Sequence, residues 1–123
     1  MTVMVLDPAE MERRTLAALI EERLVKEGSH AGVVRRAPED VFRTALPRDT
    51  AAAFITVNSM ADVEAARQFA KLYGSTPFVV VSDSGDWAVE AFRLNARHYI
   101  TRPVGEAGVR EAISRCRAAA DSA

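Results

Sequence analysis

The segment Thr76–Val104 constrains the fold most, because it reads as a strand, a turn, a helix and a second strand. Phe78–Val81 is an apolar, β-rich run that is too short for a helix, and turn-forming residues flank it. An amphipathic helix follows, marked at helical spacing by Ala88, Ala91 and Phe92. Asn95-Ala96 closes this helix, and His98–Thr101 makes the second strand. A unit of this kind predicts parallel pairing of its two strands.

The same alternation of strand and helix runs through the whole chain. The predicted strands are Val3–Leu6, Gly32–Arg35, Ala52–Val57, Phe78–Val81 and His98–Thr101. The predicted helices run from Pro8 to Gly28, Pro38 to Leu46, Ser59 to Tyr73 and Ala88 to Asn95, with a fifth around Val109–Cys116. Five apolar strands, each followed by a helix, imply a parallel sheet covered on both faces. We therefore predict an α/β, flavodoxin-like, doubly wound fold with strand order 2-1-3-4-5 and five helices.

Helix starts and apolar stripes give more detailed expectations. Asp7 is the predicted N-cap of the first helix, with Pro8 in its first turn. Ser59 and Asp62 form a capping-box-like start for the third. In the second helix, Val41 and Phe42 are expected to face inward. The last helix is expected to bury its apolar stripe, which consists of Val109, Ala112, Ile113 and Cys116.

Composition sets the class of protein. A chain of 123 residues suits a single domain over 1–123, with an Ala-rich, flexible tail at 118–123. A net charge of −1 favours neither nucleic acid nor an anionic membrane as a direct partner. One cysteine forms no internal disulfide, and no signal-peptide pattern opens the chain, so a cytoplasmic protein is expected.

The segment Thr76–Val104 resembles the second half of a response-regulator receiver domain. In that resemblance, Ser82 is the hydroxyl that ends the fourth strand, and Tyr99 is the switch aromatic. Arg102 stands where the family has lysine, and Pro103 follows it, as the family's proline does after a cis bond. The resemblance covers essentially the whole chain, although element order supports its first half more than motifs do.

The first strand keeps too few acids for the family's metal site. Receivers hold Mg²⁺ with paired carboxylates, because this hard cation prefers oxygen ligands. Asp7 is the only acid at this strand end. An ungapped match places Pro8 at the second acid position, whereas a shift of one residue makes Asp7 the second acid and Leu6 the first residue. Either match lacks one carboxylate, so we expect no metal and no cofactor.

The third strand ends without the family's phosphoacceptor aspartate. The resemblance places Thr56 at the acceptor position and Asn58 at the third position of the pattern. A threonine hydroxyl needs a base or a metal to act as a nucleophile, and none is evident. Asp62 is an alternative, displaced acceptor, but it lies in a helix start, where capping explains it.

These residues predict a degenerate phosphorylation pocket at one edge of the sheet. Its members are Asp7, Thr56, Asn58, Ser82 and Arg102, and we expect an ion pair between Arg102 and Asp7. Trp87 could cover the edge of the core or be an exposed anchor for a partner, and Tyr99 belongs to the interface of the resembled family. The residues expected to point outward on this interface are Trp87, Val89, Arg93, Tyr99 and Arg110.

The function we predict is a phosphorylation-independent, receiver-like signalling and interaction module of the two-component type, and not an enzyme. It is most similar to receivers attached to LytTR-type DNA-binding domains, which implies transcription regulation. The expected partner is a protein or a second copy, bound through the fourth helix, fifth strand and fifth helix. Two alternatives stay open: a phosphorelay receiver that uses a displaced acid, and a small flavodoxin-like ligand-binding domain.

Overall fold

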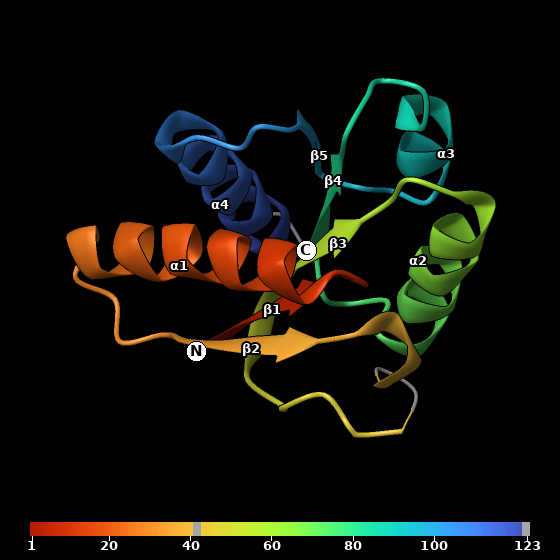
Figure 1. Ribbon diagram of the computed structural model, residues 1–123. Helices are drawn as coiled ribbons and strands as arrows, with labels where there is room; N and C mark the ends of the chain where they lie inside the picture. Colours follow the sequence, from red (N-terminus) through yellow and green to blue (C-terminus); the bar gives the residue numbers. More distant parts are fainter. Residues whose placement is uncertain (41–42, 122–123) are drawn as a thin grey trace.

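The computed structural model describes residues 1–40 and 43–121, and its strands form one parallel sheet (Figure 1). The strands are β1 (Thr2–Leu6), β2 (Gly32–Arg36), β3 (Thr50–Thr56), β4 (Phe78–Ser82) and β5 (His98–Thr101). Their order in the sheet is β2-β1-β3-β4-β5, and every neighbouring pair is parallel. The predicted doubly wound sheet and its strand order are therefore confirmed.

Helices lie on both faces of this sheet. They are α1 (Glu10–Lys26), α2 (Met60–Leu72), α3 (Ala88–Arg93) and α4 (Glu106–Asp121). Figure 1 shows α1 and α4 on one face, and α2 and α3 on the other. In the described part of the chain, no helix has both the length and the apolar character needed to cross a membrane.

The two faces bury two separate cores. Val3 and Val5 of β1 belong to the core under α1 and α4, whereas Met4 and Leu6 belong to the core under α2 and α3. This division follows from the pleat of a strand, which sends successive side chains to opposite faces. Because both faces are covered, each central strand reads in the sequence as a continuous apolar run.

The prediction of five α-helices is wrong, because the described chain has four. Where a helix was expected from Pro38 to Leu46, the described residues contain a single 3₁₀ turn, η1, over Pro38–Asp40. The carbonyl of Asp40 accepts hydrogen bonds from the backbone N–H groups of Arg43 and Thr44, and the chain then leaves the turn. Pro47 follows closely, so the segment is too short to offset the cost of starting an α-helix. The expected inward residues, Val41 and Phe42, lie outside the described residues.

The two predicted helix caps have different outcomes. The helix α1 begins at Glu10 after Ala9, and no side chain caps it, so Asp7 is not its N-cap and Pro8 precedes the helix. The cap of α2 is confirmed, because Ser59 Oγ accepts the Asp62 N–H at 3.1 Å. The Asp62 carboxylate in turn accepts the backbone N–H of Asn58 at 2.8 Å.

The helix α3 is short and buries less than its pattern suggests. It has six residues, and of the expected stripe only Ala91 is buried. The side chain of Phe92 is 56% exposed, since a helix of fewer than two turns presents little of its surface to the sheet. Trp87 is partly buried against the α2/α3 core, so it covers the edge of that core.

The helix α4 buries the predicted stripe of Val109, Ala112, Ile113 and Cys116. Burial raises the pKa of the Cys116 thiol to about 11, which keeps it protonated and fits a role in packing. The helix continues through Asp121, so residues 118–121, expected in the tail, are helical. Residues 122 and 123 lie outside the described chain.

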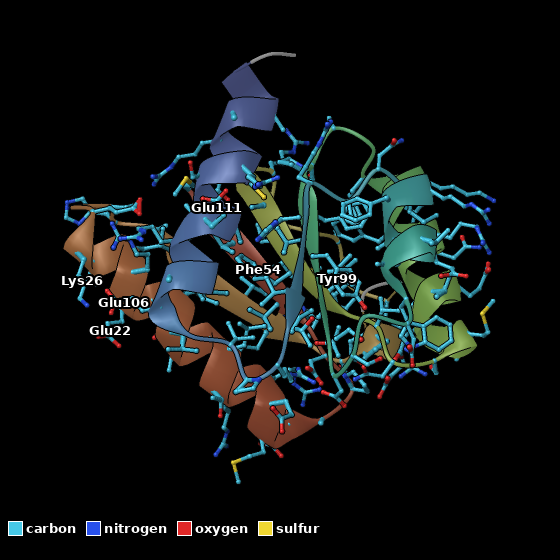
Figure 2. All side chains as sticks on the ribbon, turned by 90° about the horizontal axis from the view of Figure 1, so that it is seen from above. Glu22, Lys26, Phe54, Tyr99, Glu106 and Glu111 are labelled. Carbon is cyan, nitrogen blue, oxygen red and sulfur yellow. The ribbon has the colours of Figure 1, made fainter. Side chains whose placement is uncertain are left out.

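Ion pairs join α1 to α4 where the two helices meet (Figure 2). Lys26 Nζ lies 2.7 Å from Glu106 Oε1 and 3.5 Å from Glu22 Oε1. The next residue, Glu27, is the C-cap of α1 and pairs with Arg23 of that helix at 2.8 Å and with Arg117 of α4. The Glu27 side chain is only 15% exposed, so solvent screens this pair less than the outer ones.

Replacing Glu27 with glutamine should lower the free energy of unfolding at neutral pH by about 1 kcal/mol. The hydrogen bond from Arg23, aided by Arg117, holds the pKa of Glu27 below its ordinary value of 4.5. A folded-state pKa below the unfolded one stabilises the fold above pH 4.5, and this contribution is lost as pH falls through the folded value. Urea unfolding at several pH values should therefore show the difference shrinking below pH 4.5. Glu39→Gln, at an exposed site, is the control and should show no such difference.

Candidate functional site: a strand-end cluster around Asp7 and Arg102

Polar residues meet where β1, β3, β4 and β5 end. The strand register places Leu6 beside Ile55, and Thr56 beside Val81, so that the carboxyl ends of the strands lie at one edge. At this edge Asp7, Thr56 and Ser82 are buried, with exposed fractions of 1%, 3% and 0%. Such an edge is the usual ligand-binding place in a doubly wound sheet, so this cluster is the candidate site.

Both carboxylate oxygens of Asp7 are engaged. Its Oδ1 accepts the backbone N–H of Ala9 at 2.8 Å. Its Oδ2 accepts the hydroxyl of Thr56 at 2.5 Å and also a hydrogen bond from Arg102 Nη2. The carbonyl oxygen of the same residue accepts Arg13 Nη1 at 2.7 Å. The side chain thus joins β1 to β3 and β5, which explains why it is not available to cap α1.

Arg102 is the centre of the charge network. Besides Asp7, its Nη2 donates to Thr56 Oγ1 at 3.1 Å, and its Nη1 donates to Asp83 Oδ1 at 3.3 Å. Its Nε lies 3.7 Å from Glu12 Oε2. Burial opposes the charged form, but the hydrogen bond and charge of Asp7, with the other acids, raise the pKa of Arg102 above its ordinary value. The peptide bond from Arg102 to Pro103 is cis.

Ser82 takes part in a second set of contacts. Its backbone carbonyl accepts the Arg102 N–H at 2.8 Å, which keeps it beside the ion pair. Its hydroxyl donates to Asn58 Oδ1 at 2.9 Å, and the Asp83 N–H donates to the same oxygen at 2.8 Å. The five residues of the predicted pocket therefore form two linked networks, one on Asp7 and one on Asn58.

The residues present do not fit a magnesium ion of the kind held by receiver folds. Mg²⁺ needs free carboxylate oxygens, and those of Asp7 already accept three donors, one of which carries a positive charge. The acids Glu12 and Asp83 are 48% and 67% exposed, and both pair with Arg102. Within residues 1–40 and 43–121, no three His, Cys, Asp or Glu side chains form a candidate metal group.

Several solved structures with the same fold are receivers. A response regulator receiver protein from Pseudoalteromonas atlantica matches with a TM-score of 0.80 and 18% identity over 98% of this chain and 99% of that one. The response regulatory domain of protein mrkE from Klebsiella pneumoniae gives 0.75 and 20% over 100% of both chains. A response regulator from Thermotoga maritima gives 0.73 and 18% over 98% and 97%. The fold is that of a receiver domain. No protein-family model and no curated protein matches the sequence.

Tyr99, which the sequence comparison with receivers predicted to be the switch aromatic, lies on β5. The ring is half-buried, and its hydroxyl donates to the backbone carbonyl of Ser84 at 2.6 Å. Its ring centroid lies 6.5 Å from that of Phe92 on α3. Figure 2 shows Tyr99 on the side of the sheet that α3 covers. The aromatic is therefore tied to the loop between β4 and α3, which begins directly after Ser82.

Three contact residues of the site were not predicted from the sequence: Glu12, Arg13 and Asp83. Asp83 follows the predicted strand end directly, so its position could have marked it as a candidate. Glu12 and Arg13 lie in the first turn of α1, and helical spacing alone does not show which of them faces Arg102 or the Asp7 carbonyl. Their roles depend on the angle at which α1 leaves β1.

A cavity of about 130 Å³ borders the site, and its lining residues are Glu12, Thr15, Leu16, Leu19, Arg102, Pro103 and Val104. Pockets that hold small organic ligands usually measure about 300 Å³ or more. This cavity does not favour the alternative of a small ligand-binding domain.

Proposed function

We propose that this protein is a non-enzymatic, receiver-like signalling module that acts without an aspartyl phosphate. One observation carries this proposal: the Asp7 carboxylate, the Thr56 hydroxyl and the Arg102 guanidinium bond to one another. A phosphorylated receiver needs an acceptor carboxylate, a metal and a basic residue at this edge. Here an internal ion pair takes up the space between the strand ends, so the pocket is closed by its own residues.

The alternative of a displaced acceptor finds little support in the geometry. Asp62 is committed to the start of α2, where its Oδ2 accepts the Asn58 N–H at 2.8 Å. Asp83 is exposed, but its carboxylate pairs with Arg102, and no metal site accompanies it in the described chain. Phosphoryl transfer to an acid without a metal or another electrostatic clamp would lack the main stabilisation of its transition state.

No phosphoryl adduct should form when the protein is incubated with acetyl phosphate and Mg²⁺, because the acceptor position holds a threonine bonded to Asp7. Intact-mass spectrometry measures the adduct, and a phosphorylatable receiver treated in parallel shows that the reagent is active. An adduct that hydroxylamine removes would be an acyl phosphate and would overturn the proposal. Asp62→Asn and Asp83→Asn would then identify the acid responsible.

A surface made by α3, β5 and α4 is the proposed docking face for a second copy or a protein partner. On it Val89 and Phe92 are 59% and 56% exposed, and the arginines Arg93 and Arg110 are also exposed. Trp87 and Tyr99, expected to be outward, are partly buried, so the exposed anchor is Phe92. Aromatic and arginine side chains are enriched at interfaces. A role as the sensory half of a transcription regulator, similar to LytTR-type receivers, would use this face.

Sedimentation should show self-association of the wild type that is unchanged by Mg²⁺ or beryllofluoride and is lost in Val89→Ser/Phe92→Ser. Removing two exposed apolar anchors takes away the centre of the contact without opening the core. Val25→Ser is the control, because Val25 is 74% exposed on α1, outside the α3–β5–α4 surface and on the face of the sheet opposite α3, and should leave association unchanged. A wild type that stays monomeric at high concentration would contradict self-association and leave only a different protein as partner.

A further inference from the structure

The side chain of Asn58 bridges the ends of β3 and β4. Its Oδ1 accepts the Ser82 hydroxyl at 2.9 Å and the Asp83 backbone N–H at 2.8 Å. A backbone N–H can only donate, so the atom that faces it must be the amide oxygen and not the amide nitrogen. Asn58 therefore presents one fixed acceptor to two donors of the next strand end.

Asn58 is itself held in place from the other side. Its backbone N–H donates to Asp62 Oδ2, and Asp62 also belongs to the capping box at the start of α2. The backbone of Asn58 is thus tied to the Asp62 carboxylate and does not belong to a free loop. Such pre-organisation lowers the entropy cost of keeping the two donors in one arrangement.

A continuous series of hydrogen bonds leads from Asn58 to the switch aromatic. Ser82 Oγ accepts the Ser84 N–H at 3.4 Å, and the Ser84 carbonyl accepts the Tyr99 hydroxyl at 2.6 Å. The Ser84 hydroxyl oxygen also accepts the Asp86 N–H at 3.2 Å. The series crosses from β3 to β5 through the loop 83–87, which ends at Trp87.

We infer that Asn58 is a positioning residue that latches this loop: its amide oxygen supplies the acceptor that an added oxyanion would otherwise provide. The latch holds Ser82, the loop 83–87 and Tyr99 in one position without any ligand. Asp83 reinforces this latch, because its backbone N–H donates to Asn58 Oδ1 and its carboxylate accepts a hydrogen bond from Arg102. The inference rests on the proposed function for what the latch regulates, which is the permanent presentation of the α3–β5–α4 face.

The single tryptophan, Trp87, reports directly on this loop. In Asn58→Ala, the Trp87 emission should move to longer wavelength, and acrylamide should quench it more strongly. The Asp83 amide, freed of its acceptor, should exchange with solvent roughly five- to tenfold faster. Asn58→Asp keeps an acceptor oxygen at the same place and should restore the wild-type values of both measurements.

Ser59→Ala is the matched control. It removes a hydrogen bond of similar strength one residue away, at the α2 cap, but leaves the Asn58 amide in place. It should lower stability without changing Trp87 emission or Asp83 exchange. Equal changes in Ser59→Ala and Asn58→Ala would mean that both variants loosen the fold in general, and this would overturn the latch. An Asn58→Ala protein that is folded and unchanged in both measurements would also overturn it.

If Asn58→Ala does not fold, Tyr99→Phe tests the same series from its other end. Loss of the hydroxyl frees the Ser84 carbonyl, so exchange at Asp83 should again accelerate. An unchanged Asp83 amide in a folded Tyr99→Phe protein would overturn the inference. None of these measurements needs a phosphodonor or a partner. A phosphoryl adduct would therefore refute the proposed function without contradicting the latch. Unchanged Trp87 fluorescence and Asp83 exchange would refute the latch without contradicting the proposed function.

Discussion

Replacing Arg102 with methionine should lower the free energy of unfolding by about 3 kcal/mol. The change removes the cation but leaves the Asp7 carboxylate, which is 1% exposed, inside the fold. The carboxylate keeps only the Thr56 hydroxyl and the Ala9 N–H as partners, and two neutral donors do not replace a charge. Because Arg102 is 17% exposed, some water can reach the site, and the loss should lie near the lower end of the range for a broken buried pair.

A double-mutant cycle in urea separates the pair from the other contacts of Arg102. Asp7→Asn combined with Arg102→Met removes both charges, so the double variant should recover to within about 1 kcal/mol of the wild type. Arg102→Lys is the conservative control. It keeps the charge but loses the planar fork that reaches Asp7, Thr56 and Asp83 together, and should cost about 1 kcal/mol. An Arg102→Met protein as stable as the wild type would show that the buried carboxylate does not depend on the guanidinium.

Phe54→Ala should cost about 3–5 kcal/mol of unfolding free energy, the largest loss expected from a change in the core. Phe54 lies in the middle of β3, is fully buried, and packs in the core under α1 and α4 (Figure 2). Truncation leaves a cavity between the sheet and two helices that are joined by ion pairs and cannot easily close it. Chemical denaturation of the purified variant measures the loss.

Phe92→Ala is the matched control, because it deletes the same atoms at a position that is 56% exposed. Its effect on unfolding should stay within about 0.5 kcal/mol. Equal losses at the two positions would mean that Phe92 is buried in solution, which self-association through the α3–β5–α4 face would cause. Repeating the comparison at low protein concentration distinguishes burial of Phe92 by self-association from burial within one molecule.

Apolar runs predicted the strands well, and amphipathic patterns predicted a long helix better than the short ones. The runs Val3–Leu6 and Phe78–Val81 are strands within one residue of their predicted bounds, since a strand covered on both faces has no other reading at that length. The stripe on α4 was also predicted correctly, because four turns supply enough positions to define a face. The segment Pro38–Leu46, which begins at one proline and ends before another, is too short to sustain an α-helix, whereas the pattern at Ala88–Phe92 predicted a helix correctly but was too short to define its buried face.

In the candidate site, too, some features were predictable from the sequence and others were not. That Asp7, Thr56, Ser82 and Arg102 share an edge follows from parallel strands, whose carboxyl ends always lie on one side. Residue type also implied the attraction of Arg102 to Asp7. The sequence does not give the distances that decide which hydroxyl donates to which acceptor. Asp7 was therefore expected to cap a helix, but its carboxylate accepts the Thr56 hydroxyl, and the Ser82 hydroxyl donates to Asn58.

Local patterns were therefore enough for the parallel sheet, its strand order and the polar edge, because burial and strand polarity act on every residue in the same way. The links from Asn58 to Tyr99 and from Arg102 to Asp83 were decided only by tertiary structure. Each joins residues at least fifteen positions apart in the sequence, and each depends on ångström differences in how neighbouring strands and helices pack. Hydrogen bonds weaken steeply with small changes in distance and angle, so only the packed fold determines which of these partners meet.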